Sequence, residues 1–190
     1  LAALGRQTGS PAEAFLPAST GIIGWRLPVA EMEAALPGLV AGARGGSIVP
    51  VARAIMTTDR FPKVRGRAVG HGRLVGIAKG AGMIEPRLGT LLCFLLTDVS
   101  VGREELRSAL AWAAGRTLNR IAIDGDQSTS DMAVLLSSGT KGAADPAAFR
   151  AALAEVLADL AADVVRNGEG TSHVIRVTVT GARDDAEAVG

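Results

Sequence analysis

The chain has 190 residues, which suits one domain or one large lobe with a sizeable core. Its net charge of +1, with 20 basic and 19 acidic residues spread along the chain, and its aromatic content of 3% argue against a nucleic-acid-binding surface. A single cysteine excludes an internal disulfide. The apolar runs are too short for a membrane helix, and no signal peptide is evident. We therefore expect a cytoplasmic protein without a nucleic-acid or membrane partner.

The first half of the chain predicts two helices and a hairpin. Residues 28–36 favour a short helix with Pro28 in its first turn, ended by Pro37 and Gly38. Residues 48–56 are apolar and favour a second helix. Residues 65–78 predict a β-hairpin that turns at Gly70–Gly72. This half therefore places its regular structure after residue 28.

The second half alternates strands and helices. Strands are expected at 91–96, where burial on both faces would enclose Cys93, and at 121–124, 132–136 and 174–179. Helices are expected at about 101–115, capped by Ser100, and from Asp145, the cap, to Asn167. The longer helix carries an apolar stripe (Phe149, Leu153, Val156, Leu157, Leu160, Val164). This alternation predicts an α/β or layered α+β fold.

Thr90 stands where a glycine- and proline-containing turn runs into an apolar strand. A threonine hydroxyl is a poor nucleophile until a base takes its proton. Cleavage of the Gly89–Thr90 bond would free an α-amine with a pKa near roughly 8 beside that hydroxyl, and this amine is a suitable base. Gly89 leaves the attacked carbonyl unobstructed. The same residues also fit an ordinary loop-to-strand junction.

Residues 79–92, KGAGMIEPRLGTLL, resemble the self-cleavage site of the ornithine acetyltransferase family, the bifunctional glutamate N-acetyltransferases of arginine biosynthesis. The usual family pattern is K-G-x-G-M-x-x-P-x-x-A-T-[ML]-L, and the chain departs from it at Gly89, where the family has Ala. Four further stretches agree with the family in the same order: 19–24 (STGIIG), 54–59 (AIMTTD), 124–131 (DGDQSTSD) and 167–170 (NGEG).

The resemblance implies a self-cleaving N-terminal-nucleophile fold, with sheets sandwiched by helices, and a role for each matching residue. Fragments 1–89 and 90–190 would fold together as one lobe. Thr90 would be the nucleophile, freed by cleavage after Gly89, and Thr20 with Gly21 would hold the oxyanion. The substrate-binding residues would be Thr57, Lys79, Thr90 and Glu169. Without the family, turn or solvated-surface roles explain these residues as well.

The implied reaction moves an acetyl group from N-acetylornithine to glutamate through an acetyl-threonine enzyme. It needs no dissociable cofactor, although some relatives use acetyl-CoA as donor, and the implied assembly is a heterotetramer of two copies of each fragment. Asp124, Asp126 and Asp131 lack the Glu of a calcium loop, so we expect no metal.

Two alternatives stay open. One is a self-cleaving amidase or aminopeptidase, with water as the final acceptor. The other is an inactive partial relative acting as a scaffold, because the family has a further substrate-contacting Asn and Thr near its carboxy terminus that no region of this chain matches.

Overall fold

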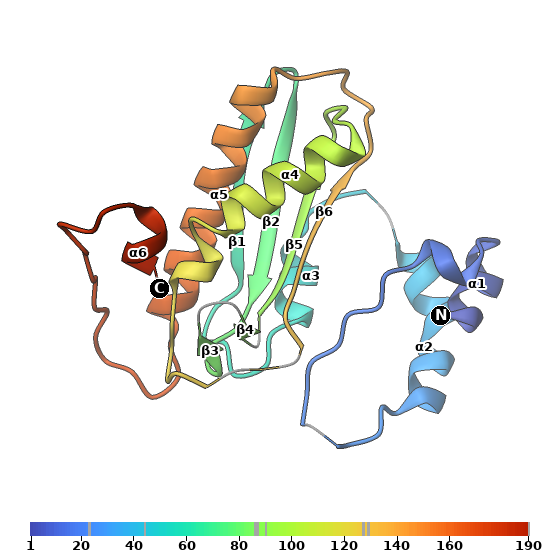
Figure 1. Ribbon diagram of the computed structural model, residues 1–190. Helices are drawn as coiled ribbons and strands as arrows, with labels where there is room; N and C mark the ends of the chain where they lie inside the picture. Colours follow the sequence, from blue (N-terminus) through green and yellow to red (C-terminus); the bar gives the residue numbers. More distant parts are fainter. Residues whose placement is uncertain are drawn as a thin grey trace.

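A twisted mixed sheet forms the centre of the molecule (Figure 1). The computed structural model describes residues 1–22, 24–43, 45–85, 88–89, 91–126, 128 and 130–189, with only the backbone described for 88, 89 and 189. Within these residues four strands join in the order β1 (Lys63–Val69), β2 (Gly72–Lys79), β5 (Leu92–Thr97) and β6 (Met132–Ser137). The β1–β2 and β2–β5 pairs are antiparallel. The β5–β6 pair is parallel, and its crossover contains helix α4 (Arg103–Ala114).

Helices α4 and α5 (Pro146–Arg166) cover one face of this sheet and enclose the core (Figure 1). Helix α5 begins as the sequence predicts, since the Asp145 carboxylate accepts the Ala148 N–H at 2.8 Å and Pro146 occupies the first turn. Its whole predicted apolar stripe is buried against β1, β2 and α4. The expected α/β class, with helices packed on a mixed sheet, is confirmed; the N-terminal-nucleophile architecture stays a prediction.

The opposite face of the sheet is partly exposed. Leu96 of β5 and Leu136 of β6, which are neighbours across the parallel pair, expose 41% and 50% of their surface. Strand β5 is therefore buried on both faces only at Leu92 and Cys93, and the expectation of burial along its whole length is wrong. Alternate residues of a strand point to opposite faces of the sheet. Beyond Cys93, Leu95 points to the face that the helices cover, whereas Leu96 points to the open face.

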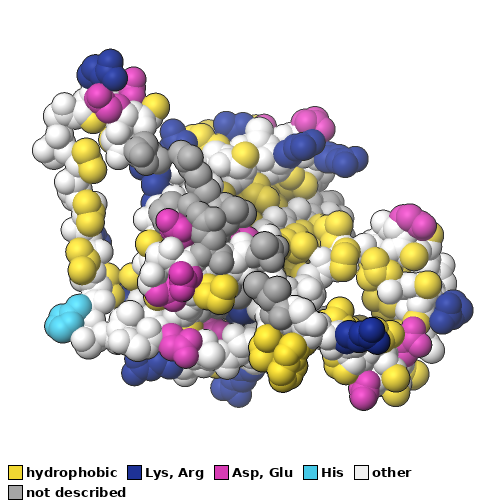
Figure 2. Space-filling model, turned by 60° about the horizontal axis from the view of Figure 1, so that its bottom comes forward, with side chains coloured by type: hydrophobic (Ala, Val, Ile, Leu, Met, Phe, Trp, Pro, Cys, Tyr) yellow, Lys and Arg dark blue, Asp and Glu magenta, His cyan; other side chains and the backbone are white. Residues whose placement is uncertain are grey.

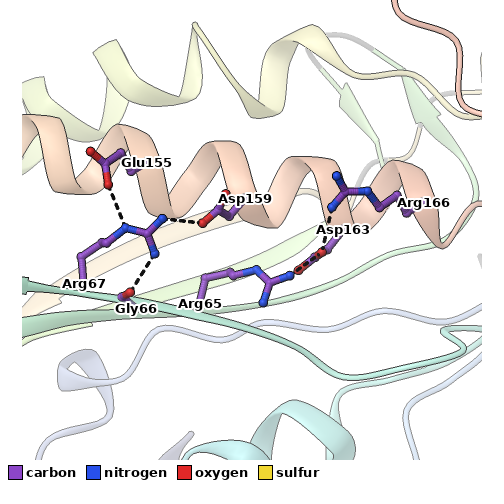
Figure 3. Close-up of polar contacts among 7 residues, drawn as sticks. All are labelled: Arg65, Gly66, Arg67, Glu155, Asp159, Asp163 and Arg166. Carbon is purple, nitrogen blue, oxygen red and sulfur yellow. Dashed lines mark hydrogen bonds and ion pairs between the residues drawn. The ribbon is translucent and has the colours of Figure 1, made fainter.

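Ion pairs fasten α5 to the edge strand β1 (Figure 3). Arg67 donates to Glu155 at 2.8 Å and to Asp159 at 2.7 Å, and Arg65 donates to Asp163 at 2.7 Å. Residues two apart on a strand are separated by about 6.6 Å, and residues four apart on a helix by about 6 Å. Successive arginines of β1 therefore lie opposite successive acidic residues of α5. The pairs fix how far α5 extends along β1, and so where the loop after Arg166 begins.

The amino-terminal part lies apart from the sheet (Figure 1). Helix α1 (Ala2–Thr8) packs on α2 (Val29–Gly42), and a short 3-10 turn, η1 (Ala12–Ala14), follows α1. Pro37 lies inside α2, so the expectation that it ends this helix is wrong. Proline removes one N–H donor, but no residue of α2 is buried, and solvent can satisfy the carbonyl that is left over. Helix α3 (Val49–Ala54) lies against β1 and β2.

Three further local expectations are wrong. Residues 121–124 follow a 3-10 turn, η2 (Leu118–Arg120), and make only an isolated bridge to Ile84 instead of a sheet strand. Helix α4 takes Gly102 as its N-cap, while the Ser100 N–H bonds the Gly142 carbonyl at 2.6 Å. Residues 174–179 form no strand among the described residues, and Figure 2 shows hydrophobic side chains along the exposed arch that leads to α6 (Asp185–Val189).

Candidate active site

The candidate site gathers at the end of β2, where Lys79 leads into the loop Gly80–Met83. Lys79 lies opposite Leu92 of β5, and Leu92 lies opposite Met132 of β6. Beyond the loop, β3 (Ile84–Glu85) and β4 (Leu88–Gly89) pair with each other, and the chain then reaches residue 90. This end of the sheet therefore brings Lys79 close to Met132, although the two residues are 53 positions apart in sequence (132 − 79).

Asp59 holds this end of the sheet together. Its Oδ1 accepts the Gly80 N–H at 2.9 Å and the Lys63 ammonium at 2.5 Å, and its Oδ2 accepts the Thr57 N–H at 3.1 Å. Burial alone would raise the pKa of Asp59, but the hydrogen bonds from Lys63, Gly80 and Thr57 outweigh it and lower that pKa. Asp59 is therefore an anion that ties the segment before β1 to the end of β2.

This tie brings two predicted substrate-binding residues into contact. The Lys79 ammonium donates to the Thr57 hydroxyl at 3.3 Å, although the residues are 22 positions apart. Lys79 is 2% exposed, whereas Thr57 is exposed to solvent. The pair therefore joins a buried cation to a hydroxyl on the surface, an arrangement suited to an incoming carboxylate.

The charge on Lys79 is only partly compensated. Burial lowers its pKa most, the charges of Asp59 and Asp131 raise it, and the charge of Lys63 lowers it. Within the described part of the chain the Lys79 ammonium has no carboxylate within 4 Å, because Asp59 bonds Lys63 instead. An anionic substrate group would complete this arrangement of charges.

Glu169 reaches the same loop from the end of α5. Its N–H donates to the Ala81 carbonyl at 2.6 Å, and a Cβ on Gly82 would lie only 3.4 Å from Glu169 Oε2 and 3.3 Å from Asp124 Oδ2. Asp124 Oδ2 in turn accepts the Met83 N–H at 2.7 Å. Gly82 therefore leaves room for two carboxylates, and the exposed Glu169 side chain can receive an ammonium group.

Two residues here have backbone angles that side chains rarely adopt. Met83 has a φ of 53° and Asp124 a φ of 67°, and the hydrogen bond between them joins the two. Such conformations cost roughly 1–3 kcal/mol each and gather at functional sites. This local strain agrees with a functional role for the loop.

The proposed nucleophile, Thr90, lies outside the described residues, but the backbone on both sides of it is described. Gly89 pairs with Ile84, and Ile84 exchanges hydrogen bonds of 3.2 and 2.6 Å with Ile123. On the other side the Leu91 N–H donates to Asp131 Oδ1 at 2.7 Å, and the Leu91 carbonyl accepts the Met132 N–H at 2.9 Å. The proposed cleavage point therefore lies between two segments that are each hydrogen-bonded to a neighbour.

The predicted oxyanion residues Thr20 and Gly21 lie on the long connection between η1 and α2. Gly21 has a φ of 151°, in a region that favours glycine. Within the described residues no hydrogen bond joins either of them to Thr57, Lys79 or Glu169. Their role in holding an oxyanion stays a prediction.

Cys93 is buried within the sheet. Burial raises the pKa of the Cys93 thiol to about 12, which agrees with its predicted role as a buried hydrophobe. Across the described residues no three His, Cys, Asp or Glu side chains gather to hold a metal, and Asp124 Oδ1 accepts the Asp126 N–H instead. In the same part of the chain no helix is both long and apolar enough to span a membrane.

Sequence reasoning gave no role to Asp59 or Asp131, although both stand in stretches that match the family. Each is a lone carboxylate beside the end of a strand, and each accepts a backbone N–H from a distant segment. Asp131 directly precedes the apolar strand β6, and this position is the signal that could have identified it, because a partly buried carboxylate needs donors. Asp59 precedes the charged strand β1 and gives no such signal.

Comparison with known proteins identifies the family. The sequence profile of the ArgJ family matches residues 1–190. The chain belongs to the ArgJ family. It is 45% identical to the "arginine biosynthesis bifunctional protein ArgJ" of Nitratidesulfovibrio vulgaris, with 97% of the chain and 49% of the relative covered.

Two further ArgJ relatives give a similar comparison. "Arginine biosynthesis bifunctional protein ArgJ 2" of Nostoc is 43% identical, with 96% of the chain and 47% of the relative covered. "Glutamate N-acetyltransferase Oat2" of Streptomyces clavuligerus is 44% identical, with 98% and 47% covered. The chain thus spans about half the length of the curated ArgJ relatives it matches.

Proposed function

We propose that this chain carries the acyl-transfer centre of a glutamate N-acetyltransferase, which moves an acetyl group from N-acetylornithine to glutamate through an ester on Thr90. The observation that carries the proposal is that Thr57 contacts Lys79, and Glu169 contacts Ala81, where the chain enters the segment that leads to the Gly89–Thr90 bond. Membership of the ArgJ family supports the reaction class, since relatives are named as bifunctional arginine-biosynthesis proteins and as a glutamate N-acetyltransferase.

Maturation comes first. The Thr90 hydroxyl oxygen attacks the Gly89 carbonyl carbon and loses its proton, while the bond from that carbon to the Thr90 nitrogen breaks and the nitrogen takes up a proton. Water then hydrolyses the resulting ester, which leaves a carboxylate on Gly89 and restores the hydroxyl of Thr90. The products are fragments 1–89 and 90–190, and the second begins with an amine that can act as a base.

Transfer then proceeds in two half-reactions. The freed amine takes the proton of the Thr90 hydroxyl, whose oxygen attacks the acetyl carbon of N-acetylornithine, and ornithine leaves with its nitrogen protonated. The amine of glutamate next attacks the acetyl-Thr90 ester, and the Thr90 oxygen recovers a proton. Thr20 and Gly21 hold the oxyanion of each tetrahedral intermediate.

The described residues supply charges that suit these substrates. The Lys79 ammonium and the Thr57 hydroxyl, 3.3 Å apart, match a carboxylate, and the exposed Glu169 carboxylate matches an ammonium group. Both N-acetylornithine and glutamate carry a carboxylate, and ornithine also carries an ammonium. The reaction requires no dissociable cofactor, whereas acetyl-CoA remains a candidate second donor, and we propose a heterotetramer of two copies of each fragment.

The decisive test of maturation is the intact mass of the purified protein together with amino-terminal sequencing. Wild type and Thr90→Ser should each yield two fragments, the second beginning at residue 90, and Thr90→Ala should stay whole. Thr178→Ala, an exposed threonine on the carboxy-terminal arch, is the matched control and should cleave normally. An uncleaved wild-type chain with full activity would overturn the mechanism.

Turnover of N-acetylornithine tests the transfer step. Glutamate should raise the rate of ornithine release, whereas an equal rate without glutamate would favour the amidase alternative. Lys79→Met should raise KM for N-acetylornithine more than it lowers kcat, because it removes a charge that binds substrate. Lys141→Met, at an exposed lysine outside the site, should leave both constants unchanged.

A further inference from the structure

Leu91, the residue after the proposed nucleophile, is held through both of its backbone polar groups. Its N–H donates to Asp131 Oδ1 at 2.7 Å, and its carbonyl accepts the Met132 N–H at 2.9 Å. In a parallel pair a backbone carbonyl normally receives such an N–H, but here the Asp131 side chain takes that place. Leu91 is only 9% exposed, so little water can compete for either bond.

The hydrogen bond to Asp131 constrains Thr90 through covalent geometry. The Leu91 N–H belongs to the peptide group that joins Thr90 to Leu91, and the six atoms of that group, including the Thr90 Cα, are coplanar. A carboxylate that fixes the direction of this N–H therefore restricts the plane of the Thr90–Leu91 peptide, to which the residue with the proposed nucleophile is covalently attached. Displacements of about 1 Å in such groups can cost roughly 100-fold in rate.

Asp131 also has a charge that no described cation neutralises directly. Among the described residues it has no ion-pair partner within 4 Å, and Lys79 on β2 is the cation whose charge acts on it. The other charged groups that act on Lys79 are Asp59 and Lys63, and these bond each other. Burial raises the pKa of Asp131 to about 6, although the Leu91 N–H and Lys79 oppose that rise. The charge of Asp131 is therefore lost in mild acid.

We propose that Asp131 is a positioning residue for Thr90: its ionised carboxylate fixes the Thr90–Leu91 peptide and thereby aims the nucleophile. This inference rests on the proposed function. A neutral side chain of the same shape still offers an oxygen to Leu91, but an anion accepts a stronger and shorter bond from an N–H. The carboxylate matters for orientation, so its charge, and not only its shape, should control the rate.

Asp98 provides a matched control. Its Oδ1 also accepts a backbone N–H from a sheet strand, that of Arg73 at 2.6 Å, and it follows β5 at the opposite end from Leu91. Asp131→Asn and Asp98→Asn thus each remove a negative charge that accepts a strand N–H, and only the first lies beside the proposed site. Asp98 also pairs with the exposed Arg73 guanidinium at 3.7 Å.

The first experiment tests the geometry without any need for activity. In the uncleavable Thr90→Ala protein, the NMR amide proton shift of Leu91 is followed from pH 4 to 8. It should titrate with a midpoint near 6, and the added Asp131→Asn change should abolish that titration. A Leu91 amide that does not respond to pH would overturn the proposal, whatever the protein catalyses.

The second experiment measures the rate of self-cleavage against pH, which is informative because cleavage precedes release of the Thr90 amine. The wild-type rate should rise through about pH 6, and Asp131→Asn should be slower by roughly 10- to 100-fold at pH 7 and lose that rise. Asp98→Asn should retain the wild-type rate and profile. Asp131→Glu, which restores the charge, should recover part of the rate and the pH dependence.

The outcomes separate this inference from the proposed function. If Leu91 titrates and wild type cleaves, but Asp131→Asn cleaves at the wild-type rate, the positioning role is wrong and the proposed function stands. If wild type does not cleave at any pH, the proposed function fails, and the assigned role of Asp131 fails with it even where Leu91 titrates. Slow, pH-independent cleavage by a folded Asp131→Asn protein supports the proposal.

Discussion

Replacing Asp59 with asparagine tests the ion pair that holds the site end of the sheet. The side chains of Asp59 and Lys63 are both completely buried, and within the described residues the Lys63 ammonium also lies over the Phe61 ring, 5.3 Å from its centre. Asparagine leaves that ammonium buried without a counter-ion, which costs about 3–5 kcal/mol. It also turns an amide NH₂ toward a backbone donor, either Thr57 or Gly80, at about 1 kcal/mol or more.

The expected loss of about 4 kcal/mol is a large part of the roughly 5–15 kcal/mol that stabilises a domain of this size. Urea unfolding followed by circular dichroism measures it as a fall in the free energy of unfolding. The double variant Asp59→Asn, Lys63→Met removes both charges and should recover about 2 kcal/mol or more. Arg67→Ala, on the same strand but with a side chain that is 37% exposed, is the control and should lower the free energy of unfolding far less than Asp59→Asn does. A loss below about 1 kcal/mol for Asp59→Asn, or no recovery in the double variant, would refute the reasoning.

Three further predictions follow from single residues. Gly76→Ala should destabilise the protein by about 1–3 kcal/mol in urea unfolding, because its Cβ would lie 2.8 Å from Leu160 Cδ1 in the core, and an unchanged midpoint would contradict this. Cys93, with its thiol pKa raised to about 12, should resist a disulfide reagent at pH 8 until the protein is unfolded; rapid reaction of the native protein would show that the strand opens. Because the folded-state pKa of Asp131 is raised above its unfolded value of about 3.9, its contribution to stability is present in acid and is lost as pH rises through about 6. The melting temperature of Asp131→Asn should therefore exceed that of wild type at pH 7 but not at pH 4, and equal differences at both would contradict it. Asp59 affects stability over a different pH range. Because its pKa is lowered in the folded protein, its contribution to the free energy of unfolding is present at neutral pH and is lost only as pH falls below about 4.

The parts of the fold that sequence predicts well are those where local chemistry and packing agree. Helix α5 has its cap, its first-turn proline and its apolar stripe within 21 residues, and all three are present in the structure. The β1–β2 hairpin likewise turns at Gly70, whose φ of 55° needs glycine. In both elements each local preference points to the same structure.

Sequence alone misses the features that depend on a distant partner. Residues 174–179 have the alternation of a strand, but a strand needs a neighbour, and the described residues supply none. Pro37 predicts a helix end, yet the exposed setting of α2 tolerates it. The Thr57–Lys79 contact also cannot be found by spacing, because it depends on a carboxylate, Asp59, that holds two separate segments.

The charges at the site end of the sheet are difficult to explain by stability. A buried ion pair is seldom more stabilising than apolar side chains of the same volume, and Lys79 is buried without a carboxylate in contact within the described residues. Burial moves the pKa of Lys79 down and that of Asp131 up, so the fold penalises the charged form of each. The ion pairs between β1 and α5 align these two elements (Figure 3). Lys79 and Asp131 take no part in those pairs. Lys79 and Asp131 are thus two poorly compensated charges on either side of the segment that leads into Leu92. Because they are held apart, each can interact with an opposite charge on a substrate or a nucleophile, which favours a chemical role for this part of the sheet.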